Sequence, residues 1–214
     1  MQYQEVVVPE NERNRHLWDI NEKEGFQSIN IDGNPYNVNI KRDPQGKVQC
    51  ARLLRFLDLY IQQLIDDLVQ HCIKHGMMSE SCKLISKTPY SVQEIEYDSG
   101  FHGINKPKGI IKSNTKKKHF KLDNDLRATW RLIMLELRKR NGSYMSWNRG
   151  QNCIKKTLLH ELAHTMCNHI RYRTSGNHQK DFHDNEKILL ELGYNPSNEL
   201  KELEDDIINF IRYQ

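Results

Sequence analysis

The segment Thr157-Leu158-Leu159-His160-Glu161-Leu162-Ala163-His164-Thr165-Met166 contains the pattern His-Glu-x-x-His within a stretch that predicts one helix. Four residues make about one helical turn, so the imidazoles of His160 and His164 lie on one face and can bind one cation. Two neutral nitrogen ligands favour zinc, and an open coordination position lowers the pKa of a bound water to about 7. Glu161 can act as the catalytic base that takes and returns the proton of this water.

The predicted helix is apolar around most of its circumference. Its apolar positions form two neighbouring stripes, which comprise Leu159, Ala163, Met166 and Ile170, and Leu158 and Leu162. A helix of this kind is buried. Buried histidines and a buried carboxylate without partners are costly to desolvate, and a metal ion supplies those partners. We therefore predict zinc as the cofactor of a central buried helix.

A catalytic zinc usually has a third protein ligand. The candidates after the helix are His169, His178, Asp181 and His183. His169 lies about 140° round the helix from His164 and is expected to point away. His178 follows the turn-forming residues Ser175-Gly176-Asn177, which allow the chain to return to the site, and His183 is the second choice.

These segments resemble the WLM metalloproteases and their Spartan/SprT relatives. In that family, His-Glu-x-x-His is followed after a variable loop by Gly-x-His-x-x-x-Phe, whose histidine is the third zinc ligand. Residues 176–182 of this chain read Gly-Asn-His-Gln-Lys-Asp-Phe. The resemblance therefore selects His178 as the third ligand and makes Phe182 the residue that seats the next helix. A looser similarity links residues 100–110 to the family's Gly-Leu-Asn strand segment.

The resemblance implies a zinc-dependent endopeptidase that cleaves proteins attached to DNA, including DNA–protein crosslinks, and hence a role in DNA repair. The implied partners are a DNA-attached protein substrate and DNA itself, single-stranded or bound without sequence preference. Some relatives act on ubiquitin- or SUMO-linked proteins. The chain stops at Gln214 without their long regulatory tail, so the sequence does not support ubiquitin or SUMO binding. The loop between His164 and His178 is longer than in WLM proteins and closer to the Spartan type.

The formal net charge is only +4, but basic residues are concentrated before the zinc helix. One stretch without acidic residues contains Lys106, Lys108, Lys112, Lys116, Lys117, Lys118 and Lys121, and a second group contains Arg127, Arg131, Arg138, Lys139 and Arg140. The lysines either form a solvated loop or bind DNA phosphates with salt-dependent, sequence-independent affinity. Tyr144 and Trp147 can stack on unpaired bases, and Trp147 can instead pack in the core.

Two other functions fit the same residues. The first is a zinc peptidase or amide hydrolase without a nucleic-acid partner, whose lysines only keep it in solution. The second is a non-catalytic, zinc-stabilised DNA-binding protein. Glu161 argues against the second function, because a purely structural zinc site needs no carboxylate at that position.

The composition fits a single-domain intracellular enzyme. Residues 1–10 lack the basic start and apolar core of a signal peptide, and no stretch approaches the ~20 apolar residues of a membrane helix. The five cysteines are scattered, so we expect reduced thiols, with Cys167 either a small buried residue or close to the metal. We expect a protein that is not secreted and acts in the nucleus or wherever DNA is handled; a viral source is compatible with this sequence.

Apolar periodicity predicts helices over Val48–His75, Asp125–Arg140, Gln151–Ile170, Asp181–Leu192 and Ser197–Tyr213. Alternation predicts a strand over Tyr90–Tyr97 with residues 109–111 as its partner, and shorter strands at residues 6–8 and 29–31. We expect residues 1–47 to form a partly irregular extension and residues 48–214 to form the metalloprotease domain. Helices packed on a small sheet give an α+β, zincin-like fold.

Overall fold

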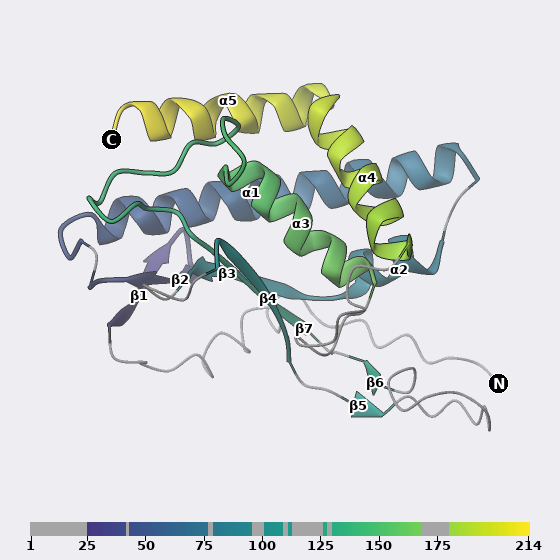
Figure 1. The fold of residues 1–214 in the computed structure, drawn as a ribbon, viewed down its shortest axis with the longest axis horizontal. Coiled ribbons are helices and arrows are strands. Elements are labelled where there is room, and N and C mark those ends of the chain that lie inside the picture. Colours follow the sequence, from purple (N-terminus) through teal and green to yellow (C-terminus); the bar gives the residue numbers. More distant parts are fainter. Residues whose placement is uncertain are drawn as a thin grey trace.

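A computed structural model describes residues 25–41, 43–76, 79–95, 101–108, 111–112, 126–127, 130–167 and 180–214. These residues form one α+β domain in which helices cover one face of a three-stranded sheet (Figure 1). The helices are α1 (Lys47–Lys74), α2 (Glu80–Lys87), α3 (Ile154–Met166), α4 (Lys180–Tyr194) and α5 (Asn198–Arg212). In the described part of the chain, no helix is both long enough and apolar enough to cross a membrane.

The longest helix, α1, confirms the helix predicted over residues 48–75. Its buried side chains recur every three or four residues and include Leu53, Leu57, Tyr60, Leu64 and Leu68. The helix therefore buries one continuous face. In Figure 1, α1 lies between the sheet and α5. The α5 helix begins after Ser197, whose side chain accepts a hydrogen bond from the Leu200 amide, as expected of an N-cap.

One buried ammonium group joins four helices. Lys155, near the start of α3, donates a hydrogen bond of 2.6 Å to the carbonyl oxygen of Gly193 in α4. Its Nζ also forms an ion pair with the carboxylate of Glu204 in α5. That carboxylate accepts a further hydrogen bond of 3.1 Å from the Tyr60 hydroxyl of α1. Glu204, one of the acidic residues near the C-terminus, is therefore buried in the core.

The three-stranded sheet consists of β3 (Tyr90–Glu94), β7 (Trp130–Leu135) and β4 (Gly103–Lys108), in the order β3-β7-β4. The central strand β7 is parallel to β3 and antiparallel to β4, with Ile133 opposite both Val92 and Asn105. All six residues of β7 are buried. Ile133 and Leu135 join the main core beneath the helices, and the alternate residues join a second cluster on the other face, formed by Ile95, Trp130, Leu132, Met134 and partly buried Ile104.

The helix predicted over Asp125–Arg140 is wrong, because residues 130–135 form β7 and residues 126–127 form β6. A strand buried on both faces is apolar at nearly every position and shows no alternation. Its apolar residues then also match a helical spacing. Of the residues predicted to pair with β3, residues 109–110 lie outside the described residues. Ile111 belongs to β5 (Ile111–Lys112), which pairs with β6 (Leu126–Arg127), and the described partner of β3 is β7.

A β-hairpin precedes α1. Strands β1 (Phe26–Ile31) and β2 (Asn34–Asn39) are antiparallel and are joined by Asp32 and Gly33, which both have positive φ. Two such residues form the tight turn that matches the twist of a hairpin. Tyr36 of β2 is buried and donates a hydrogen bond of 2.9 Å to Asp58 of α1. The strand predicted at residues 29–31 is confirmed, and the one at residues 6–8 lies outside the described residues.

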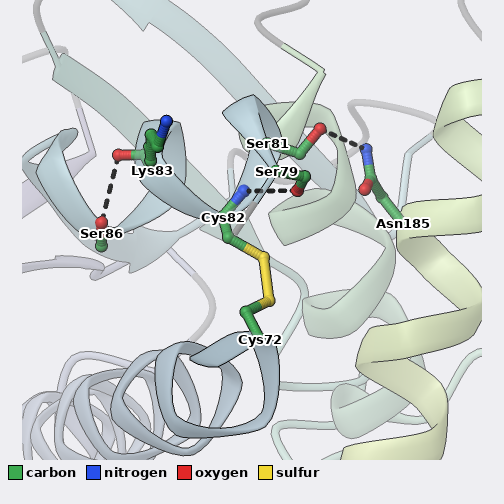
Figure 2. Close-up of a disulfide and its surroundings, with 7 residues drawn as sticks. All are labelled: Cys72, Ser79, Ser81, Cys82, Lys83, Ser86 and Asn185. Atoms are coloured by element: carbon green, nitrogen blue, oxygen red, sulfur yellow. Dashed lines mark hydrogen bonds between the residues drawn. A yellow bond between two sulfur atoms is a disulfide. The ribbon is translucent and has the colours of Figure 1, made fainter. Parts of the chain in front are cut away.

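A disulfide bond joins Cys72 near the end of α1 to Cys82 in α2 (Figure 2). The expectation that all five cysteines are reduced thiols is therefore wrong for this pair. The chain turns back after α1, and α2 packs against its last turns, which brings two cysteines ten positions apart into contact. Figure 2 also shows Asn185 of α4 donating a hydrogen bond of 3.3 Å to Ser81 of α2.

Candidate metal centre

Helix α3 carries the His-Glu-x-x-His residues and packs against α2, α4, β4 and β7. Leu158, Leu159, Leu162, Ala163 and Met166 are buried, which leaves few positions of the helix open to solvent. The helix lies inside the predicted range of residues 151–170, and residues 168–170 lie outside the described part of the chain. Because its buried apolar side chains hold α3 in one orientation, the polar side chains of this helix also keep fixed positions.

His160 and His164 lie next to each other on this helix. Their ring centroids are 5.1 Å apart and the rings are nearly perpendicular. The ring of Phe182 in α4 packs against both, with centroid distances of 5.1 Å to His160 and 4.7 Å to His164. Phe182 is fully buried, so it seats α4 on the histidine-bearing face of α3. Both histidines are only partly buried and remain accessible to a ligand.

Glu186 of α4 contacts the first of these histidines. Its Oε1 lies 2.8 Å from Nδ1 of His160, and its Oε2 lies 3.7 Å from Nδ1 of His183. Sequence reasoning did not identify Glu186. The available signal was its position four residues after Phe182 on a predicted helix, because this spacing puts both side chains on the face that packs against α3.

The Glu161 side chain lies on the β4 side of α3. It is only 5% exposed, and burial raises its pKa to about 8, while a hydrogen bond with the backbone of Asn105 acts in the opposite direction. A Cβ atom added to Gly103 of β4 would lie 2.8 Å from Oε1 of Glu161 and 2.5 Å from Cγ2 of Thr157. Glycine at this position therefore leaves the room that the Glu161 carboxyl group occupies. A cation bound nearby would favour its ionised form.

Asn105 fastens β4 to α3. Its side-chain amide donates hydrogen bonds of 2.6 Å to the carbonyl oxygen of Glu161 and 2.8 Å to the hydroxyl of Thr165. Its own amide oxygen accepts a hydrogen bond of 3.4 Å from Arg131 of β7. Gly103 and Asn105 both belong to the segment with the looser family similarity, and both contact α3 around Glu161.

The candidates for the third zinc ligand follow α3 in the sequence. His169 and His178 fall outside the described residues. Asp181 and His183 lie in α4, and the side chain of His183 is 62% exposed. Among the residues that the structure describes, no group of three or more His, Cys, Asp or Glu side chains could hold a metal ion. The described part of the site thus supplies two imidazoles on one helical face, and its donors fit a zinc site that needs one more ligand.

Cys167 faces α4. Its sulfur accepts a hydrogen bond of 3.2 Å from Asn185, and burial raises the pKa of the thiol to about 11. The partly buried side chain of Cys167 thus packs between α3 and α4.

The predicted nucleic-acid-binding lysines are only partly described. Lys106 and Lys108 lie in β4 and are partly exposed, and Lys112 lies in β5. Lys116, Lys117, Lys118 and Lys121 lie outside the described residues. The structure therefore places the first two lysines on the strand whose beginning contacts Glu161.

Two arginines of the second basic group are buried, and so is Trp147, for which the sequence left stacking on bases and core packing open. Arg131 and Arg138 are each 1% exposed, and Arg138 forms an ion pair of 2.7 Å with Glu94. Trp147 is also buried and packs edge-on against Tyr60, which confirms its role in the core and excludes stacking on bases. The second basic group is therefore smaller on the surface than its sequence indicates, because two of its arginines stabilise the sheet.

No family model, no curated protein and no solved structure matches this chain. Its function must therefore be inferred from α3 and the groups around it.

Proposed function

We propose that the protein is a zincin-like, zinc-dependent endopeptidase whose metal is held by His160, His164 and His178. The observation that carries this proposal is the pair of imidazoles on one face of α3, with the Glu161 carboxyl group one residue away and held between α3 and β4. A bound zinc would act as a Lewis acid and lower the pKa of a water molecule. Glu161 would accept a proton from this water and donate it to the leaving amine.

The sheet supports a polypeptide as the substrate. Among the described strands, the order β3-β7-β4 makes β4 one of the two outer strands of this sheet, and its first residue, Gly103, lies against Glu161. An extended peptide running beside the beginning of β4 would place a peptide bond within reach of the catalytic base. Recognition of extended chains by outer strands is a recurring mode of peptide binding.

The ligand assignment can be tested by metal analysis of single variants. His178→Ala should lose most of the zinc, as should His160→Ala and His164→Ala, because each removes one of three protein ligands. His183→Ala on α4 is the matched control and should retain the metal. Retention of zinc by His178→Ala together with its loss from His183→Ala would show that the assignment of the third ligand is wrong.

Catalysis can be tested separately with Glu161→Gln. This variant should retain its fold and its zinc, because Glu161 moves a proton and does not bind the metal. Turnover of a DNA-binding protein, measured with and without single-stranded DNA, should fall by about 10²–10⁴-fold, the usual contribution of a general base. Normal proteolysis by this variant would remove the proposed mechanism.

We further propose that the natural substrates are proteins attached to DNA. Support comes from Lys106 and Lys108, which lie on the strand that begins beside Glu161. Because they alternate with Asn105, their side chains belong to the face of β4 opposite α3, so DNA bound there would lie across the sheet from the zinc site. The same basic stretch continues to Lys121 in the sequence. Backbone contacts of this kind need no base sequence, which suits an enzyme whose target is defined by attachment to DNA.

Charge reversal of Lys116, Lys117 and Lys118 to Glu tests this second proposal. DNA affinity and DNA-stimulated cleavage should fall together, and the salt dependence of binding should become shallower because fewer phosphates are neutralised. Cleavage of a short unstructured peptide needs only the zinc site and should be nearly unchanged. Unchanged DNA affinity would instead favour a zinc peptidase without a nucleic-acid partner, and equal loss of peptide cleavage would mean that the lysines support the fold.

A further inference from the structure

The face of α4 that packs on α3 is marked by four residues at helical spacing. Phe182, Glu186, Leu189 and Gly193 lie four, three and four positions apart, and all except Glu186 are buried. Gly193 makes the approach especially close, because a Cβ atom there would lie 2.9 Å from a methyl carbon of Leu159. The position of Glu186 relative to α3 is thus fixed by tight packing on both sides of it along α4.

Glu186 is the one charged residue on this face, and its carboxylate lies against His160. The distance of 2.8 Å between Oε1 and Nδ1 is that of an N–H···O hydrogen bond. The side chain of Glu186 is 22% exposed, so this contact is shielded from most of the solvent. An imidazole that donates its Nδ1 hydrogen to a carboxylate leaves the lone pair of Nε2 available for a metal.

We infer that Glu186 is a positioning residue for the zinc ligand His160. Its carboxylate selects the tautomer with the hydrogen on Nδ1, fixes the orientation of the ring and increases the basicity of Nε2. This inference rests on the proposed zinc site and adds to it a residue that does not touch the metal.

The geometry distinguishes this role from direct ligation. Two ligand atoms that are each about 2.0–2.2 Å from a tetrahedral zinc lie roughly 3.3 Å apart, whereas Oε1 and Nδ1 are 2.8 Å apart. The other carboxylate oxygen faces His183 at 3.7 Å, which is too long for a hydrogen bond. The carboxylate is therefore engaged mainly by His160.

Zinc affinity, measured by competition with a chelator, tests the inference without relying on activity. Glu186→Ala should weaken zinc binding by about 10–100-fold, the usual effect of removing such a partner. Glu186→Gln keeps an oxygen acceptor for the Nδ1 hydrogen and should lose less. His183→Gln, one turn away on α4, removes the other neighbour of the carboxylate and should bind zinc like the wild type. Equal affinity of wild type and Glu186→Ala would overturn the inference.

Two further measurements separate the possible failures. Nitrogen NMR of the metal-free wild type should show His160 with its hydrogen on Nδ1, and Glu186→Ala should shift the ring toward the other tautomer while far-ultraviolet circular dichroism stays unchanged. An unshifted tautomer would overturn the positioning role. The visible spectrum of the cobalt(II) form should be the same in wild type and Glu186→Gln, and a changed coordination would show that Glu186 is a direct ligand. A wild type that binds no zinc would overturn the proposed function itself.

Discussion

At the scale of single residues, the lack of a side chain at Gly103 determines where the carboxyl group of Glu161 can lie. The backbone of Gly103 does not have a positive φ, so its conformation does not require glycine. What requires glycine is space, since an added Cβ would meet both Thr157 and Glu161. The Thr157 methyl group belongs to a stiff β-branched side chain, whereas the Glu161 carboxyl group can move.

Gly103→Ala should therefore displace the proposed catalytic base and leave the metal ligands in place. A misplacement of about 1 Å can reduce turnover by about 10²-fold, whereas overpacking of this kind commonly costs about 1–3 kcal/mol of stability. We expect a large fall in peptide cleavage at nearly normal zinc content. Ile104→Val, on the opposite face of β4, is the control and should leave cleavage unchanged. Wild-type turnover in Gly103→Ala would show that the position of Glu161 tolerates the methyl group.

At the scale of secondary-structure elements, Lys155 holds four helices together. Its ammonium group connects α3 to the last turn of α4 and to the middle of α5, while Tyr60 adds α1 through the same carboxylate. Removal of one member of a buried ion pair leaves the other charge without a partner, and such changes typically cost about 3–5 kcal/mol. The orientation of the histidine-bearing helix thus depends on contacts well away from the histidines.

Lys155→Met should lower the free energy of unfolding by about 3–5 kcal/mol, as measured by urea denaturation. The double variant Lys155→Met/Glu204→Gln should regain part of this loss, because no buried charge remains. Lys156→Met is the matched control, since the Lys156 side chain is exposed, and it should change stability by less than about 0.5 kcal/mol. A double variant that is less stable than Lys155→Met would show that the ion pair is not the source of the effect.

At the scale of the whole molecule, the sequence predicts best the elements that are buried on one face only. Helices α1, α4 and α5 each bury one side, and their periodicity identifies them, whereas α3 is buried on most sides and is identified by its apolar stretch around the His-Glu-x-x-His residues. The central strand β7 escapes prediction because both of its faces are buried. The same limit applies to the site, because His160, Glu161 and His164 are neighbours in sequence, whereas Glu186 reaches His160 only through the packing of α4 on α3. Contacts between distant segments leave no local pattern.

The misleading pattern of β7 has a consequence for how the newly made chain reaches its fold. During folding, each residue of β3 can pair only after a segment about forty positions later is in place. The apolar spacing of that segment also suits a transient helix. We expect this local preference to compete with the final pairing and to slow folding. The double variant Leu132→Ile/Met134→Ile keeps the side-chain volume but favours a strand over a helix. Its refolding, measured by stopped flow, should therefore be faster than that of the wild type. A slower rate would show that no such competition exists.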